Sequence, residues 1–161
     1  MKTCCVFGHR EINESEELKK ELIKNIEQLI IDKNVDTFLF GSKSRFNSLC
    51  HLVVSDIKEK YPHIKRIYIR AEYPDIDESY KKYLLESYED TYFPERIRGA
   101  GKSVFIERNF EMIDKSDFCI VYYDEENLPS DRKSGTKIAL NYAIKKGKEI
   151  IVLGTELGNR D

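Results

Sequence analysis

Residues 3–10 read Thr3-Cys4-Cys5-Val6-Phe7-Gly8-His9-Arg10, and this stretch decides the expected fold. An apolar, strand-like run ends in a glycine and two polar residues, and a helical pattern follows. The same order recurs where residues 37–40 lead into Gly41-Ser42-Lys43-Ser44, and where residues 118–123 lead into a loop closing with Ser134-Gly135-Thr136. Repeated strand, loop and helix predict a parallel α/β sheet, whose strand-to-helix loops share one edge where ligands bind.

Outward from these loops, the spacing of apolar residues predicts the remaining elements. Helices are expected over 14–32, 45–60, 102–115 and 135–146, and strands over 2–8, 35–41, 64–70, 117–123 and 149–153. The segment 71–101 is the least regular, and we expect a helical patch around residues 80–88 with a mobile loop or lid. The pattern predicts one domain over 1–161, a Rossmann-like, doubly wound parallel sheet of five strands in the order 3-2-1-4-5 with helices on both faces.

Composition narrows the classes of function. The 161 residues carry a net charge of -2 with 40% hydrophobic and 35% charged residues, which is typical of a globular protein without a strong field for nucleic acid. No run approaches the ~20 apolar residues of a membrane span, and no signal peptide is recognisable. We therefore expect a cytoplasmic protein with neither a nucleic-acid nor a membrane partner.

The four cysteines are Cys4, Cys5, Cys50 and Cys119, and their spacing matches no zinc site. Free buried thiols behave as small hydrophobic side chains. We expect that role for all of them, with no metal ion and no cofactor.

The predicted strand order places the topological switch point between strands 2–8 and 117–123. Their loops carry Gly8-His9-Arg10 and Ser134-Gly135-Thr136. The second group is expected to open a helix, where free N–H groups and the helix dipole form an anion site, although Ser134 can also be an ordinary N-cap. Arg10 suits a bidentate phosphate contact, with a solvated loop arginine as the alternative.

The loop Gly41-Ser42-Lys43-Ser44 offers two hydroxyl groups, although Ser44 can equally cap the following helix. Arg108 and Asn109 are more telling. Phe105 and Met112 flank Arg108 at helical spacing, so its guanidinium belongs on or beside an apolar stripe and needs an anionic partner. That partner is either a ligand or a carboxylate such as Asp114, Asp117 or Asp124.

Several of these stretches resemble one family. Residues 3–10 resemble the opening of YpsA-like proteins of the SLOG superfamily, which includes the DprA-type proteins and the "lonely guy" (LOG) enzymes. Glu107-Arg108-Asn109 with Met112-Ile113-Asp114 resembles a later motif of the family, and Ser134-Gly135-Thr136 resembles its phosphate-side turn. The resemblance implies a Rossmann-like domain, often a homo-oligomer, that binds nucleotides or nucleotide-derived molecules.

The chain also departs from this pattern. Asn47 stands where the family's second loop usually carries an acidic residue, and Ala139 stands at the catalytic glutamate of the LOG enzymes. An alanine cannot be a general acid or base, so the sequence favours binding of an ADP-ribose-like, cyclic or other nucleotide ligand. The alternative is an N-glycosidic hydrolase or deoxyribosyl transferase, for which Glu72, Glu107 and Asp124 are the candidate carboxylates.

The expected ligand-binding residues come from three loops and one helix. They are Gly8, His9, Arg10, Gly41, Ser42, Ser44, Arg108, Asn109, Ser134, Gly135 and Thr136. In this interpretation Gly135 and Thr136 hold phosphate, Arg10 and Arg108 neutralise it, and Gly8 and Gly41 allow the ligand to approach closely. No catalytic residue and no metal ligand is assigned.

Overall fold

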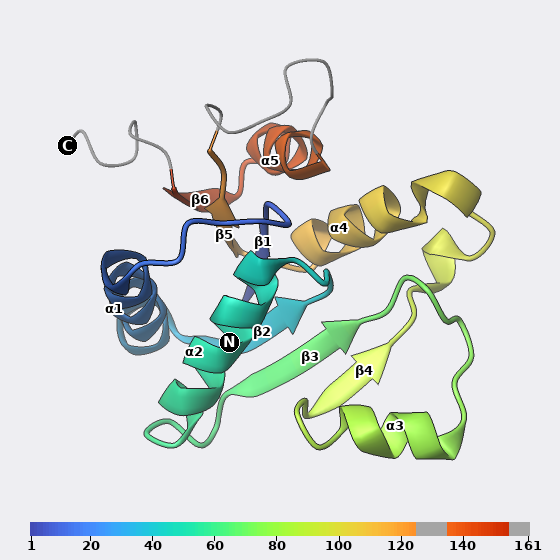
Figure 1. The fold of residues 1–161 in the computed structure, drawn as a ribbon, viewed down its shortest axis with the longest axis horizontal. Helices are drawn as coiled ribbons and strands as arrows, with labels where there is room; N and C mark the ends of the chain where they lie inside the picture. Colours follow the sequence, from blue (N-terminus) through green and yellow to red (C-terminus); the bar gives the residue numbers. More distant parts are fainter. Residues whose placement is uncertain (125–134, 155–161) are drawn as a thin grey trace.

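A computed structural model describes residues 1–124 and 135–154. Its centre is a parallel sheet of six strands in the order β4-β3-β2-β1-β5-β6 (Figure 1). The strands are β1 (Lys2–Gly8), β2 (Val35–Phe40), β3 (Lys65–Ile69), β4 (Asp90–Tyr92), β5 (Phe118–Tyr122) and β6 (Glu149–Leu153). All of them therefore end at the same edge of the sheet, which we call the carboxyl edge.

Helices cover both faces of the sheet (Figure 1). They are α1 (Glu16–Lys33), α2 (Arg45–Lys58), α3 (Glu78–Leu84), α4 (Val104–Asp114) and α5 (Gly135–Lys145). Successive strand residues point to opposite faces, so Cys4 and Val6 pack with the core beneath α1 and α2, whereas Cys5 and Phe7 pack with the core beneath α4 and α5. This double burial explains why β1 reads as an unbroken apolar run.

The prediction of five strands is wrong, because the sheet has six. The predicted order is found among β3, β2, β1, β5 and β6, and the additional β4 pairs with β3 at the outer edge. Strand β4 spans three residues and lies within the segment 71–101. The expected helical patch around residues 80–88 is also shorter than predicted, because α3 ends at Leu84.

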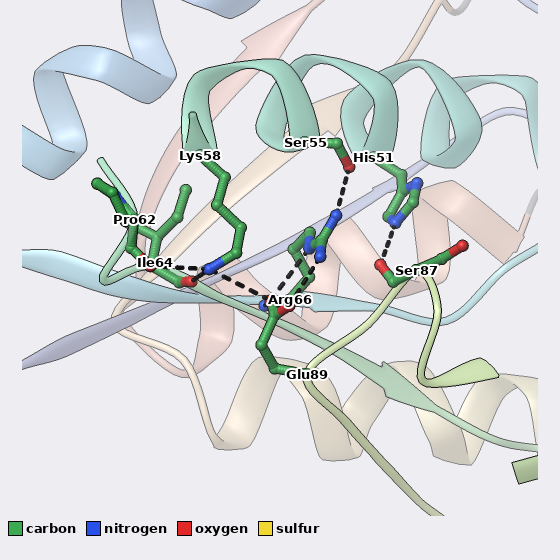
Figure 2. Close-up of polar contacts among 8 residues, drawn as sticks. All are labelled: His51, Ser55, Lys58, Pro62, Ile64, Arg66, Ser87 and Glu89. Atoms are coloured by element: carbon green, nitrogen blue, oxygen red, sulfur yellow. Dashed lines mark hydrogen bonds and ion pairs between the residues drawn. The ribbon is translucent and has the colours of Figure 1, made fainter. Parts of the chain in front are cut away.

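A polar cluster joins the β4 edge to α2 (Figure 2). The Glu89 carboxylate accepts from the Arg66 side chain through Nε at 3.0 Å and Nη2 at 2.7 Å, and from the Arg66 main-chain N–H at 2.7 Å. Arg66 Nη1 also donates to Ser55 Oγ of α2 at 3.0 Å. Arg66 and the nearby Lys58 hold the pKa of Glu89 below its usual value despite partial burial, so the carboxylate is charged at neutral pH.

We expect Glu89→Gln to lower the free energy of unfolding by roughly 1–3 kcal/mol, because it removes the negative charge opposite Arg66 and replaces one of the two accepting oxygens by an amide NH2 group that cannot accept. Chemical denaturation measures this loss. The matched control is Glu95→Gln, since Glu95 is paired with Arg98 but is 80% exposed; it should lose less than about 0.5 kcal/mol. Equal losses in the two variants would show that the cluster does not hold β4.

All four cysteines are buried, as predicted. The sulfur atoms of Cys5 and Cys119 lie 3.6 Å apart across the β1–β5 pair, and burial raises the pKa of the Cys4 and Cys50 thiols. In residues 1–124 and 135–154, no group of three or more His, Cys, Asp or Glu side chains is placed to hold a metal ion. The helices of that part of the chain include none that is long and apolar enough to span a membrane.

Candidate functional site

A pocket of about 440 Å³ opens at the carboxyl edge, beside the ends of β1 and β2 and the start of α5. Its wall residues come from segments far apart in the sequence. They are Phe7, Gly8, Arg10, Gly41, Ser42, Lys43, Ser44, Tyr68, Ala71, Glu72, Phe105, Arg108, Asn109, Gly135 and Thr136. Of the predicted site residues, all but His9 and Ser134 lie here; Ser134 lies outside the described residues. That these residues bind a ligand stays a prediction.

The order of the strands brings the pocket walls together at the topological switch point, between β1 and β5. Strand β1 pairs with β2 on one side and β5 on the other, so the chain leaves β1 and β5 toward opposite faces. Parallel topology places the loops that follow these strands at one edge. This is the arrangement that the sequence predicted from the order of its apolar runs.

The loop after β2 is fixed by its own hydroxyl groups. Ser44 is the N-cap of α2, and its Oγ accepts from the Asn47 N–H at 3.1 Å. Ser42 Oγ lies 2.9 Å from Ser44 Oγ, and Asn47 Oδ1 accepts from the Gly41 N–H at 3.3 Å. The capping alternative for Ser44 is therefore confirmed, and Ser42 is the more accessible hydroxyl of the two.

Two of the three glycines that line the pocket make room for the protein's own side chains. A Cβ at Gly8 would lie 2.6 Å from the ring of Phe46, and one at Gly41 would lie 2.7 Å from Arg108 Cδ and from Met112 Sδ. The predicted reason for these glycines, close approach of a ligand, is therefore incomplete. Gly135 differs, because a Cβ there would meet no atom of the described residues within 4 Å.

Arg108 forms the floor of the pocket. It lies on α4 and is only 4% exposed. Its Nη1 donates to the Gly41 carbonyl at 2.5 Å and its Nε donates to Asn109 Oδ1 at 3.1 Å. Burial lowers the pKa of Arg108 to about 10, so the guanidinium remains charged at neutral pH.

No carboxylate of residues 1–124 and 135–154 forms an ion pair with Arg108, and Glu72 of the pocket wall acts on its guanidinium only through a longer-range charge interaction. Asp114 pairs instead with Arg96 at 2.7 Å and accepts from Tyr142 Oη at 2.9 Å. Asp117 accepts from the Thr3 N–H at 3.0 Å, and the main-chain N–H of Asp124 donates to His9 Nε2 at 2.8 Å. No ion pair among the described residues supports the alternative of a structural carboxylate partner, and the hydrogen bonds of the guanidinium go to a main-chain oxygen and an amide oxygen.

His9 links the two switch-point loops. Its Nε2 accepts from the main-chain N–H of Asp124 at 2.8 Å, and its ring packs against Tyr123 with 5.3 Å between centroids. This hydrogen bond requires the lone pair of a neutral imidazole. Burial lowers the pKa of His9, which also favours the neutral imidazole. The structure therefore gives His9 a bridging contact rather than a place in the pocket wall.

We expect stability to fall with acidity because of His9. Its folded-state pKa is depressed, so between that value and the unfolded value of about 6.5 only the unfolded chain takes up a proton. The contribution is therefore present above about pH 6.5 and lost below it. Thermal unfolding from about pH 7.5 to about pH 5.5 should show a falling melting temperature in the wild type. His51, whose pKa burial also lowers, acts in the same direction.

The variant His9→Gln keeps a side-chain acceptor but does not titrate. It should therefore lose less stability over the same pH interval, with the contribution of His51 unchanged. An equal or steeper dependence in His9→Gln would show that His9 is not the titrating group.

The start of α5 completes the pocket. Gly135 is exposed and Thr136 is buried at 8% exposure, and both lie in the wall. The first N–H groups of an α-helix lack partners within the helix and carry its positive partial charge. Gly135 and Thr136 of this first turn line the same hollow as Arg108 and the exposed Arg10, so three sources of positive potential lie around it.

Sequence reasoning left the wall residues Lys43, Tyr68 and Phe105 out of the predicted binding residues, and it named Glu72 only as a candidate carboxylate. Lys43 and Glu72 form an ion pair at 3.2 Å on the rim, Tyr68 comes from β3, and Phe105 is 49% exposed. Of the two apolar residues that flank Arg108 on its helix, Met112 is buried and Phe105 is not. Its exposure leaves an aromatic face beside Arg108, whose guanidinium carbon lies 5.9 Å from the ring centroid.

Comparison with known proteins identifies the family. Residues 3–156 match the YpsA family model, described as the YspA SLOG family. The chain belongs to this SLOG family. It is also similar to the uncharacterized SPbeta prophage-derived protein YoqJ of Bacillus subtilis (strain 168), with 30% identity over 145 residues, covering 80% of this chain and 81% of that protein. The predicted resemblance is thus confirmed, and membership of the SLOG family suggests a nucleotide-related role.

The structure also places the position at which this SLOG chain departs from the LOG pattern. Ala139 lies on α5, is 1% exposed and packs in the core beneath that helix. Of the candidate carboxylates, Glu72 lines the pocket, whereas Glu107 and Asp124 are not among its wall residues.

Proposed function

We propose that this SLOG protein binds a nucleotide or a nucleotide-derived molecule, of an ADP-ribose-like or cyclic kind, in the pocket at the carboxyl edge. The observation that carries the proposal is Arg108. A buried cation without a counter-charge is unfavourable, and a phosphate entering the pocket supplies that charge together with acceptors for the guanidinium fork.

The other walls suit the same ligand. Arg10 and the N-terminus of α5 add positive potential for phosphate, and the exposed ring of Phe105 offers a flat apolar face. Asn109 and Ser42 present an amide and a hydroxyl group that suit a ribose or a base. The volume of about 440 Å³ falls within the range of small-molecule sites, about 300–1,000 Å³.

Thermal unfolding in the presence of AMP, ADP-ribose and a cyclic dinucleotide tests this proposal. A ligand at about 100 times its dissociation constant stabilises the folded state by about 2.7 kcal/mol, which raises the melting temperature of a domain of this size by several degrees. A shift with at least one nucleotide, and none with adenosine, is the expected result. No shift with any of the three would contradict the proposal.

An N-glycosidic hydrolase or transferase is the second candidate, and Glu72 is the observation that favours it. Its carboxylate lies in the pocket wall, where a general acid or nucleophile would be needed. The ion pair with Lys43 and the alanine at position 139 favour binding instead. Chromatographic detection of free base after incubation with AMP separates the two candidates. Base release that disappears in Glu72→Gln would establish the enzyme.

A further inference from the structure

A second hollow, of about 360 Å³, adjoins the pocket. We call it the tyrosine groove, because its walls include Tyr68, Tyr80, Tyr83, Tyr88 and His51. Ser42, Lys43 and Tyr68 line both the groove and the pocket. The two hollows therefore meet along a shared wall, within reach of one extended ligand.

The rings of the groove form two groups. Tyr68 and Tyr88 stack with 5.3 Å between centroids and 27° between planes, and His51 lies 4.6 Å from Tyr88. Tyr80 and Tyr83 stack on α3 at 6.2 Å and 18°. Tyr83 is 65% exposed, so the structure leaves a large aromatic side chain of the groove uncovered.

The two hollows differ in the charge of their wall residues. The pocket walls carry three basic side chains, Arg10, Lys43 and Arg108, and one acidic side chain, Glu72, whereas Lys43 is the one formally charged side chain among the described groove residues. His51 Nε2 lies 2.9 Å from the Ser87 carbonyl (Figure 2), and burial lowers its pKa, so it is neutral at neutral pH. Burial also raises the pKa of Tyr88 to about 12, so its hydroxyl group keeps its proton. The groove therefore suits an uncharged aromatic group rather than a second phosphate.

We propose that the tyrosine groove is the nucleobase subsite of the ligand whose phosphate lies against Arg108. The sugar of that ligand passes the shared wall at Ser42 and Lys43, and the base stacks on a groove tyrosine. Stacking accepts any base, since every base has an aromatic face. The inference rests on the proposed function and adds to it the part of the protein that holds the base.

Two probes that differ only in the base test the subsite. These are AMP and ribose 5-phosphate, each titrated calorimetrically into the wild type and into the double variant Tyr80→Leu/Tyr83→Leu. We expect the wild type to bind AMP about tenfold more tightly than ribose 5-phosphate. The double variant should lose about that factor for AMP and none for ribose 5-phosphate.

The control is Tyr73→Leu. Tyr73 contacts Tyr80 edge-on at 6.0 Å and is 51% exposed, but it does not line the groove. It should leave the affinity for both probes unchanged. Circular dichroism of each variant checks that the fold is retained, which the exposure of Tyr83 favours.

Three outcomes would overturn the inference, and each has a different meaning. If the wild type binds the two probes equally, or the double variant keeps its AMP affinity, the subsite is refuted while the phosphate site stands. If the double variant keeps its AMP affinity and in addition loses a self-association that the wild type shows in size-exclusion chromatography, the tyrosines form a contact between copies. If neither probe binds the wild type, the proposed function fails, and the subsite fails with it.

Discussion

Replacing Arg108 with methionine is expected to weaken nucleotide binding by roughly 100-fold or more, because two charge-assisted hydrogen bonds to phosphate are lost. The ligand-free protein should be no less stable than the wild type. Methionine fills much of the same space, and removing the desolvation cost of an unpaired buried charge offsets the loss of the hydrogen bonds to the Gly41 carbonyl and Asn109 Oδ1. Calorimetric titration and chemical denaturation measure the two effects.

Two further variants test whether the loss of binding comes from the guanidinium at position 108. Arg108→Lys keeps the charge but not the planar fork, so it should recover only part of the affinity. Arg98→Met is the matched control, since Arg98 is exposed and pairs with Glu95 outside the pocket, and it should not change binding. A loss of several kcal/mol of stability in ligand-free Arg108→Met would mean that Arg108 serves the fold rather than a ligand.

Gly8→Ala should lower the free energy of unfolding by roughly 1–3 kcal/mol, the usual effect of overpacking a core. The added Cβ would lie 2.6–2.9 Å from three atoms of the Phe46 side chain. Phe46 is fully buried on α2, so neither the ring nor the end of β1 can move away without disturbing the core. Chemical denaturation gives the value.

Gly135→Ala is the control for this change, because an added Cβ there meets no atom of the described residues within 4 Å. Alanine is the better helix former, so this variant should be neutral or more stable by up to about 1 kcal/mol. Similar losses at both positions would attribute the effect to backbone freedom rather than to contact with Phe46.

The framework of the sheet could be predicted because strands and helices place their apolar residues at different spacings along the sequence. The apolar runs of β1 and β6 stand out against charged neighbours, and the structure gives both strands the predicted bounds. Parallel pairing then determines which loops meet, so nine of the eleven predicted site residues, all but His9 and Ser134, lie around one pocket. This part of the site follows from topology rather than from side-chain detail.

The parts that could not be predicted depend on tertiary contacts. Strand β4 has three residues, too few for a periodic pattern, and the Arg66–Glu89 pair anchors its edge. The partner of Arg108 is a carbonyl 67 residues away in the sequence, and no local pattern points to it. The groove tyrosines come from β3, α3 and the turn before β4, and only the folded chain brings their rings together.

A crystal structure with the nucleotide that gives the largest thermal shift tests the central claim most directly. Our account predicts a phosphate group in the pocket, with an oxygen about 3 Å from the guanidinium nitrogens of Arg108 and the first turn of α5 facing the same group. A nucleotide bound elsewhere on the molecule, or a pocket without phosphate at saturating ligand, would contradict it.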